Sequence, residues 1–123
     1  MLGDGSISIA DATSVDRARL VEILSGEHVQ AAMPEVVERE IIERTVASNL
    51  EISGNEPSRL VFIKAQVGEI TAGLGLARRM QYGKYALEVV IGDGWLRRGI
   101  ASSQFVELNR RCRELGAAAT YSR

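Results

Sequence analysis

One short segment of this sequence, DGWLRRGIASS at 93–103, contains residue types and spacing that could bind a ligand. The apolar run EVVI precedes it, and a helix-like run begins at Gly99. At the start of a helix the first N–H groups have no intrahelical partner, and the helix dipole adds positive potential there. A phosphate in front of Gly99 could accept several main-chain hydrogen bonds, with Arg97 and Arg98 supplying further positive charge. Taken alone, the segment is also compatible with an ordinary structural turn.

Two common phosphate-binding motifs do not fit these residues. A P-loop requires the pattern GxxxxGK[ST], and the sequence contains no lysine in that position. A dinucleotide-binding fingerprint requires GxGxxG, but Gly92 and Gly94 are followed by Trp95 and by no third glycine at the right spacing. The segment therefore predicts an anion site built mainly from backbone groups.

Hydrophobic periodicity predicts the elements that position this segment. The expected strands cover 6–12, 60–65, 69–77 and 85–91, with a last strand in 117–122, and the expected helices cover 15–24, 33–49 and 99–116. Pro34 is tolerated in the first turn of the second helix, which should end before a turn-rich break at 53–58. This order predicts an α/β (mixed α+β) fold, a central mixed sheet with helices on both faces. The last strand–helix–strand unit should be a right-handed crossover with parallel strands.

Composition and charge narrow the functional classes. The chain has 123 residues, enough for one domain, with 15 basic and 16 acidic residues and a net charge of −1. This balance argues against broad nucleic-acid binding, which needs a basic field. One cysteine allows no intramolecular disulfide, and His28 and Cys112 alone offer no metal site. With no secretory signal and no apolar run of about 20 residues, we expect a cytoplasmic protein without a membrane partner.

The run ALEVVIGDGWLRRGIASSQFVELNRRCRELGA at 86–117 resembles the acetyl-CoA-binding core of the GNAT family of N-acetyltransferases. That core reads as an apolar strand, a turn, the signature [Q/R]-x-x-G-x-[G/A] and a helix ending in glycine. The signature falls on 96–101, with Leu96 where glutamine or arginine is usual. Residues 6–24 and 59–77 are similar to the family's opening strand and helix and to its central hairpin.

The resemblance implies one GNAT-like domain, 1–123, that lacks the family's usual last strands and helix. It also implies acetyl-CoA as co-substrate and transfer of the acetyl group to an amine. The backbone of Val89, Val90 and Ile91 would pair with the pantetheine arm, and the pyrophosphate would sit on the helix start. The residues of that cradle would be Leu96, Arg97, Arg98, Gly99, Ile100 and Ala101, with Ser102 beside them.

The catalytic residues are less well defined. Glu88 is the only acid in the expected strand 85–91 and is the candidate general base, unless it faces solvent. The family often uses a tyrosine near its C-terminus to protonate the leaving thiolate, and Tyr121 does not match it. A non-catalytic acyl-CoA-binding or protein-interaction domain on the same fold therefore stays open as the alternative. The exposed sheet edge also suggests a homodimer, and the amine acceptor is not identified.

Overall fold

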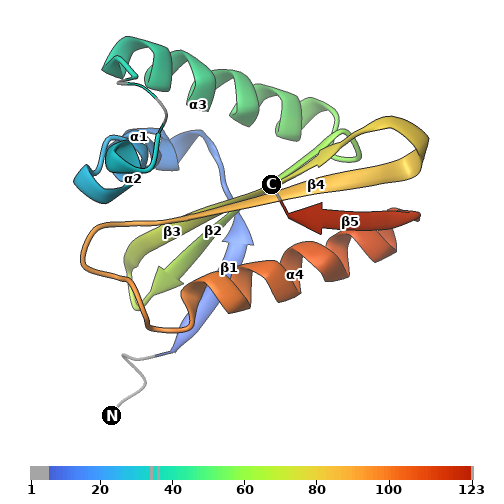
Figure 1. Cartoon of the computed structure of the whole chain (residues 1–123). Helices are drawn as coiled ribbons and strands as arrows, with labels where there is room; N and C mark the ends of the chain where they lie inside the picture. Colours follow the sequence, from blue (N-terminus) through green and yellow to red (C-terminus); the bar gives the residue numbers. More distant parts are fainter. Residues whose placement is uncertain (1–5, 34, 36, 123) are drawn as a thin grey trace.

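The computed structural model describes residues 6–33, 35 and 37–122. In this part of the chain the strands form one sheet in the order β1-β2-β3-β4-β5, with helices on both faces (Figure 1). The strands are β1 (Ile7–Asp11), β2 (Leu60–Val67), β3 (Ile70–Arg79), β4 (Lys84–Ile91) and β5 (Ala119–Ser122). The helices are η2 (Ser14–Asp16), α1 (Arg17–Leu24), α2 (Glu27–Ala31), α3 (Arg39–Asn55), η3 (Gln81–Gly83) and α4 (Ile100–Glu114).

The sheet is mixed, as the sequence predicts. β1 to β4 are antiparallel neighbours, whereas β5 pairs parallel to β4 after the α4 crossover. The predicted order of the strands and long helices and the parallel last pair are confirmed. Of the helices in the described part of the chain, none combines the length and the apolar character needed to cross a bilayer.

The two boundaries of the second predicted helix differ most from the prediction. α3 begins at Arg39, later than expected, and Pro34 lies outside the described residues. α3 also continues to Asn55, through residues whose types favour a turn, because Leu50 and Ile52 pack against the core and the Glu56 N–H bonds the Ile52 carbonyl at 2.7 Å. Tertiary packing here overrides local propensity.

The short helix α2 was not predicted at all. Its five residues are too few to show a hydrophobic period, and Val29 is its only buried residue. Contacts from a distant part of the chain hold it in place, as described below for Asp93.

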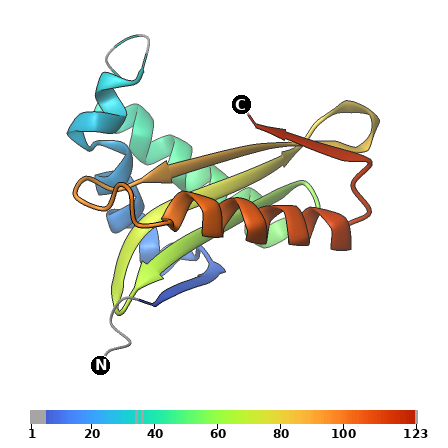
Figure 2. The ribbon, with the colours of Figure 1, turned by 60° about the horizontal axis from the view of Figure 1, so that its bottom comes forward.

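The alternation of side chains along the strands divides the core between the two faces of the sheet. On one face Leu60 and Leu74 join residues of α1 and α3. On the other face Ile63 and Leu87 pack against Leu108 of α4. Figures 1 and 2 show the same layering, with α1, α2 and α3 on one side of the sheet and α4 on the other.

Two glycines of β3 set how closely α4 approaches the sheet. A Cβ atom on Gly75 would lie 3.1 Å from Ile63 and 3.2 Å from Leu108. A Cβ atom on Gly73 would lie 3.1 Å from Nε2 of Gln104 in α4. Larger residues would push the helix away, so these glycines fix the position of α4.

A nearly buried ion pair ties the start of the first helical segment to the sheet. Lys64 Nζ lies 2.8 Å from Asp16 Oδ1, and their side chains are 14% and 9% exposed. Burial alone would raise the pKa of Asp16, but the hydrogen bonds from Lys64 and from the Thr13 N–H outweigh it and lower this pKa.

We expect Lys64→Met to lower the free energy of unfolding at pH 7 by about 3 kcal/mol, because it leaves a buried carboxylate without its partner. In the parent protein the stability that Asp16 contributes is present above its unfolded-state pKa of about 3.9 and is lost as the pH falls through the lowered folded-state value. The difference between the two proteins should therefore narrow below about pH 4. Urea denaturation from pH 3 to 8 measures it, and a pH-independent difference would contradict this account.

Candidate functional site

The sheet is incomplete beside the second half of β4. β3 pairs with β4 from Tyr85 to Ile91, but β5 pairs only with Lys84 to Leu87. Residues 88–91 therefore have no strand on their outer side among the described residues. In Figure 1, β5 lies beside only one end of β4.

The register shows which main-chain groups face this open edge. The Gly92 N–H bonds the Ala72 carbonyl, and the Met80 N–H bonds the Lys84 carbonyl, both at 2.7 Å. Hydrogen-bonded and non-bonded pairs alternate along an antiparallel ladder, so the amide and carbonyl groups of Glu88 and Val90 point toward β3. Those of Val89 and Ile91 point away from β3. They are available to a ligand that lies along the edge.

The N-terminus of α4 lies at the same end of the sheet, since Ile91 and Ile100 pack in one cluster with Ala72. Gly99 is the N-cap, with φ of 78°, a left-handed conformation that favours glycine. A Cβ atom there would meet nothing within 4 Å, so the space beside Gly99 is open. The Ser103 N–H bonds the Gly99 carbonyl at 3.1 Å.

The first N–H groups of α4 lack acceptors in the part of the chain that the structure describes. Within residues 6–33, 35 and 37–122, no acceptor bonds the amides of Ile100, Ala101 or Ser102, and α4 has no acid in its first turn. The aligned amides and the helix dipole therefore leave a positive, hydrogen-bonding surface.

The loop that joins β4 to α4 is held at its start and open at its end. The Trp95 N–H bonds the Gly92 carbonyl at 3.1 Å, and its ring packs against the cluster around Ile100. The Arg98 guanidinium lies 4.9 Å from the centre of that ring. Leu96 and Arg97 are exposed, and Arg97 has a left-handed φ of 63°. Both arginines thus border the start of α4 with their charges accessible.

Solved acetyltransferases share this architecture. PaiA N-acetyltransferase from Thermoplasma acidophilum, in complex with coenzyme A, has a TM-score of 0.71 at 15% identity, over 91% of this chain and 75% of that one. The Salmonella typhimurium protein yncA, with its cofactor acetyl-CoA, has a TM-score of 0.73 at 12% identity, over 94% and 68%. A GNAT family acetyltransferase from Staphylococcus aureus has a TM-score of 0.72 at 10% identity, over 96% and 86%. This chain has the GNAT fold.

At these identities the comparison shows the fold and not the activity. No protein-family profile matches the chain, and no curated protein sequence does. The expected resemblance and fold class are both confirmed.

Within the GNAT fold, Glu88 projects from the face that carries α1 and α3, because it lies opposite Leu76 in the register. Its side chain is exposed and makes no hydrogen bond or ion pair with the described residues. Glu88 is thus accessible to a substrate on that face, and it is not part of the edge formed by Val89 and Ile91.

Asp93 makes contacts that the sequence did not reveal. Its carboxylate accepts hydrogen bonds from the N–H groups of Glu27 at 2.9 Å and His28 at 3.4 Å, and it contacts His28 Nδ1. The Glu27 N–H contributes most to lowering the pKa of Asp93. The partners are 66 and 65 residues apart in sequence, so no local pattern could have indicated them.

The single histidine and the single cysteine do not form a metal site. His28 contacts Asp93, whereas Cys112 is buried in α4, where burial raises the pKa of its thiol. In the described ranges, no three histidine, cysteine or carboxylate side chains gather closely enough to bind a metal ion.

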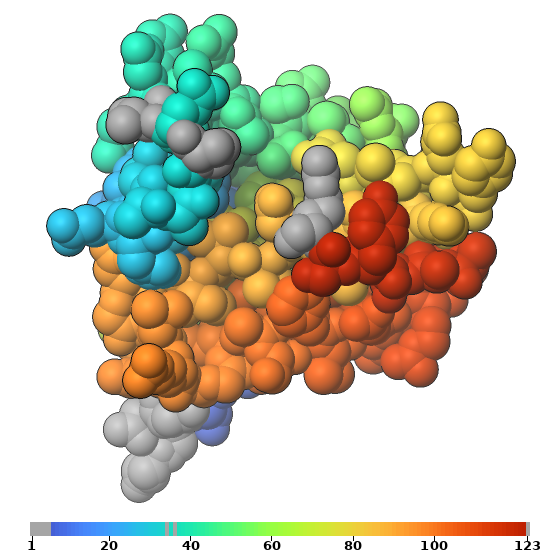
Figure 3. Space-filling model, in the orientation of Figure 1, coloured from blue at the N-terminus to red at the C-terminus, as the bar shows by residue number. Residues whose placement is uncertain are grey.

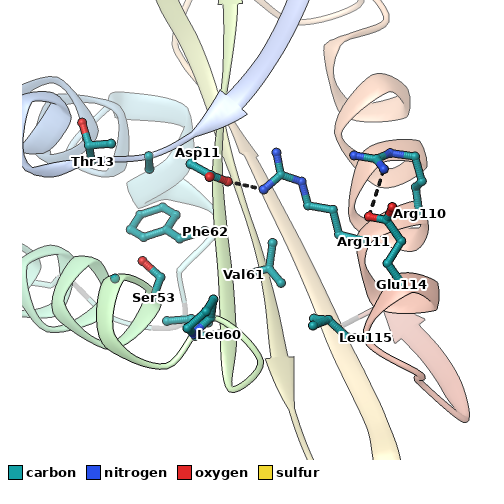
Figure 4. Close-up of a pocket in the computed structure, with 13 residues that line it drawn as sticks. Asp11, Thr13, Ser53, Leu60, Val61, Phe62, Arg110, Arg111, Glu114 and Leu115 are labelled. Carbon is teal, nitrogen blue, oxygen red and sulfur yellow. Dashed lines mark hydrogen bonds and ion pairs between the residues drawn. The ribbon is translucent and has the colours of Figure 1, made fainter.

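A cavity of about 620 Å³ lies away from the open edge, at the opposite end of α4 (Figure 4). Its charged groups satisfy one another: Arg111 pairs with Asp11, and Arg110 pairs with Glu114 at 2.9 Å. A hydrogen bond from Arg110 is the largest cause that lowers the pKa of Glu107 to about 2. This paired arrangement offers no free charge to a ligand and contains none of the predicted site residues.

We expect Gly99→Ala to lower the free energy of unfolding by about 1 kcal/mol, because alanine is strained at a positive φ. Gly54→Ala is the matched control: its Cβ also meets nothing within 4 Å, but Gly54 lies in α3. That variant should be neutral or stabilised by roughly 0.5 kcal/mol. Urea denaturation compares the two, and an equal effect at both glycines would contradict the assignment of Gly99 as a strained helix cap.

Proposed function

We propose that the chain binds acetyl-CoA as a co-substrate and acts as an N-acetyltransferase on an amine. The observation that carries this proposal is the open main-chain edge of Val89 and Ile91 beside the free amides that begin α4. Solved structures with the same fold, including those with coenzyme A and acetyl-CoA, support it.

The pantetheine arm would lie along the open edge as an added strand. Val89 and Ile91 would exchange main-chain hydrogen bonds with its amide groups, and Val90 would support the edge from within the sheet. The register therefore gives the three predicted strand residues different roles.

The pyrophosphate would lie on the start of α4. The amides of Ile100, Ala101 and Ser102 donate to its oxygens, and Gly99 leaves room for close approach. Arg97 and Arg98 add charge, and Leu96 contributes main-chain groups only.

The chemistry is direct acyl transfer. The amine nitrogen attacks the thioester carbonyl carbon, the C–N bond forms, and the C–S bond breaks to release coenzyme A as a thiolate. A main-chain N–H of the β4 edge stabilises the oxyanion of the tetrahedral intermediate. Glu88, on the face of α1 and α3, accepts the proton of the amine through water. The thiolate then takes a proton from solvent.

A non-catalytic acyl-CoA-binding domain is the second candidate. It is favoured by the exposure of Glu88, which makes no hydrogen bond or ion pair with the described residues, and by the apolar Leu96 at the first signature position. Turnover discriminates the two functions. In the transferase, Glu88→Gln lowers the rate by about a hundredfold and leaves acetyl-CoA affinity unchanged.

We expect the parent protein to bind acetyl-CoA in a calorimetric titration and Gly99→Glu to lose binding by at least about tenfold. The glutamate would place a negative charge against the pyrophosphate. Gly99→Ala is the control, because it carries the same backbone strain without the charge. No binding by the parent protein would refute both the transferase and the acyl-CoA-binding domain.

We also propose a homodimer through the sheet edge at β5. Among the described residues β5 pairs on one side only, and such an edge favours pairing with another strand. Tyr82 and Tyr121 are exposed beside it, at 86% and 42%. Sedimentation velocity should show a dimer at micromolar concentration, and Tyr121→Lys should shift it to monomer. A monomeric parent protein would contradict the dimer.

A further inference from the structure

The contact between Asp93 and α2 joins two parts of the molecule that are distant in sequence. Asp93 belongs to the loop between β4 and α4, and its carboxylate accepts the first free N–H groups of α2, from Glu27 and His28. These amides have no intrahelical partner. In the space-filling view, the surfaces of α2 (cyan) and of the segment after β4 (orange) lie side by side (Figure 3).

Gly26 makes this contact possible. It is the N-cap of α2, with ordinary backbone angles of −62° and 152°. A Cβ atom on Gly26 would lie 3.0 to 3.1 Å from three atoms of the Asp93 carboxyl group. A larger residue at this position would therefore push the carboxylate, and the loop that carries it, without straining its own backbone.

The backbone on either side of Asp93 is fixed. The Gly92 N–H bonds the Ala72 carbonyl at 2.7 Å, and the Trp95 N–H bonds the Gly92 carbonyl at 3.1 Å. A displacement of α2 is thus transmitted through the carboxylate to the loop that leads into α4. Conversely, the hydrogen bonds to Asp93 in the loop help to order α2, because a five-residue helix is not stable alone.

The helices on the other side of this contact cover the face that carries Glu88. Arg19 of α1 bonds the Thr71 carbonyl at 2.9 Å, and α1 packs against β3 and β4. If Glu88 receives the proton of the amine, the acceptor approaches on this face, beside α1 and α2.

We infer that Asp93 is a positioning residue that couples the two substrate sides. Because it caps α2, it transmits the position of the β4–α4 loop to the face of the sheet that carries Glu88. Acetyl-CoA bound at the start of α4 would therefore order α2 before the amine binds. This inference rests on the proposed function for the identity of the ligand, but the mechanical coupling is testable without it.

Amide hydrogen exchange resolved by NMR tests the coupling. Asp93→Ala should raise exchange at Glu27 and His28 by about tenfold, and Asp93→Asn, which keeps an acceptor oxygen, should restore most of the protection. Acetyl-CoA should further slow these two amides in the parent protein and in Asp93→Asn but not in Asp93→Ala. Asp93→Ala should also weaken acetyl-CoA binding by about fivefold. Asp11→Ala, which removes an exposed aspartate paired with Arg111, is the control and should change neither property.

Equal protection by acetyl-CoA in Asp93→Ala and in the parent protein would overturn the inference. If the parent protein does not bind acetyl-CoA, the proposed function fails. Amide exchange in the ligand-free protein then tests the coupling. Gly26→Ala changes only a residue of the α2 side, so it should speed exchange of the Trp95 amide, which bonds the Gly92 carbonyl in the loop. That effect should disappear when Asp93→Ala is added. An unchanged exchange rate at Trp95 in Gly26→Ala would overturn the inference.

Discussion

The site depends on the incomplete pairing of β4. This strand has a full partner in β3 but pairs with β5 only from Lys84 to Leu87. Beyond Leu87, β4 has a partner strand on one side only. The main-chain groups of Val89 and Ile91 therefore have no hydrogen-bond partner within the described chain. A ligand with amide groups of its own can satisfy them without any particular side chain.

The position of α4 converts this edge into a site for a longer ligand. Gly73 and Gly75 let α4 lie close under β3, and Leu108 and Cys112 bury its inner face. The free amides at its start are thereby held beside the end of β4. An extended ligand with an anionic end matches both features together.

The sequence predicts most of the fold and the outline of the site. Alternation and helical period locate the strands and long helices because the residues that create these patterns are local. Gly99 could likewise be identified as a site residue from the sequence, because a glycine just before a helix-like run is a local pattern. The face on which Glu88 lies required the register of β4 with β3, since a shift of one residue reverses every side chain. The contact of Asp93 with α2 required the tertiary fold, because its partners are more than 60 residues away.

The central claim is that the outer edge of β4 and the start of α4 form one binding surface for acetyl-CoA. A titration of ¹⁵N-labelled protein with acetyl-CoA, followed by NMR, tests it directly. The amides of Val89, Ile91 and 100–102 should show the largest shift changes, and the amides of Glu88 and Val90, which point toward β3, should change much less. Changes of equal size along 88–91, or changes confined to another part of the molecule, would contradict the account.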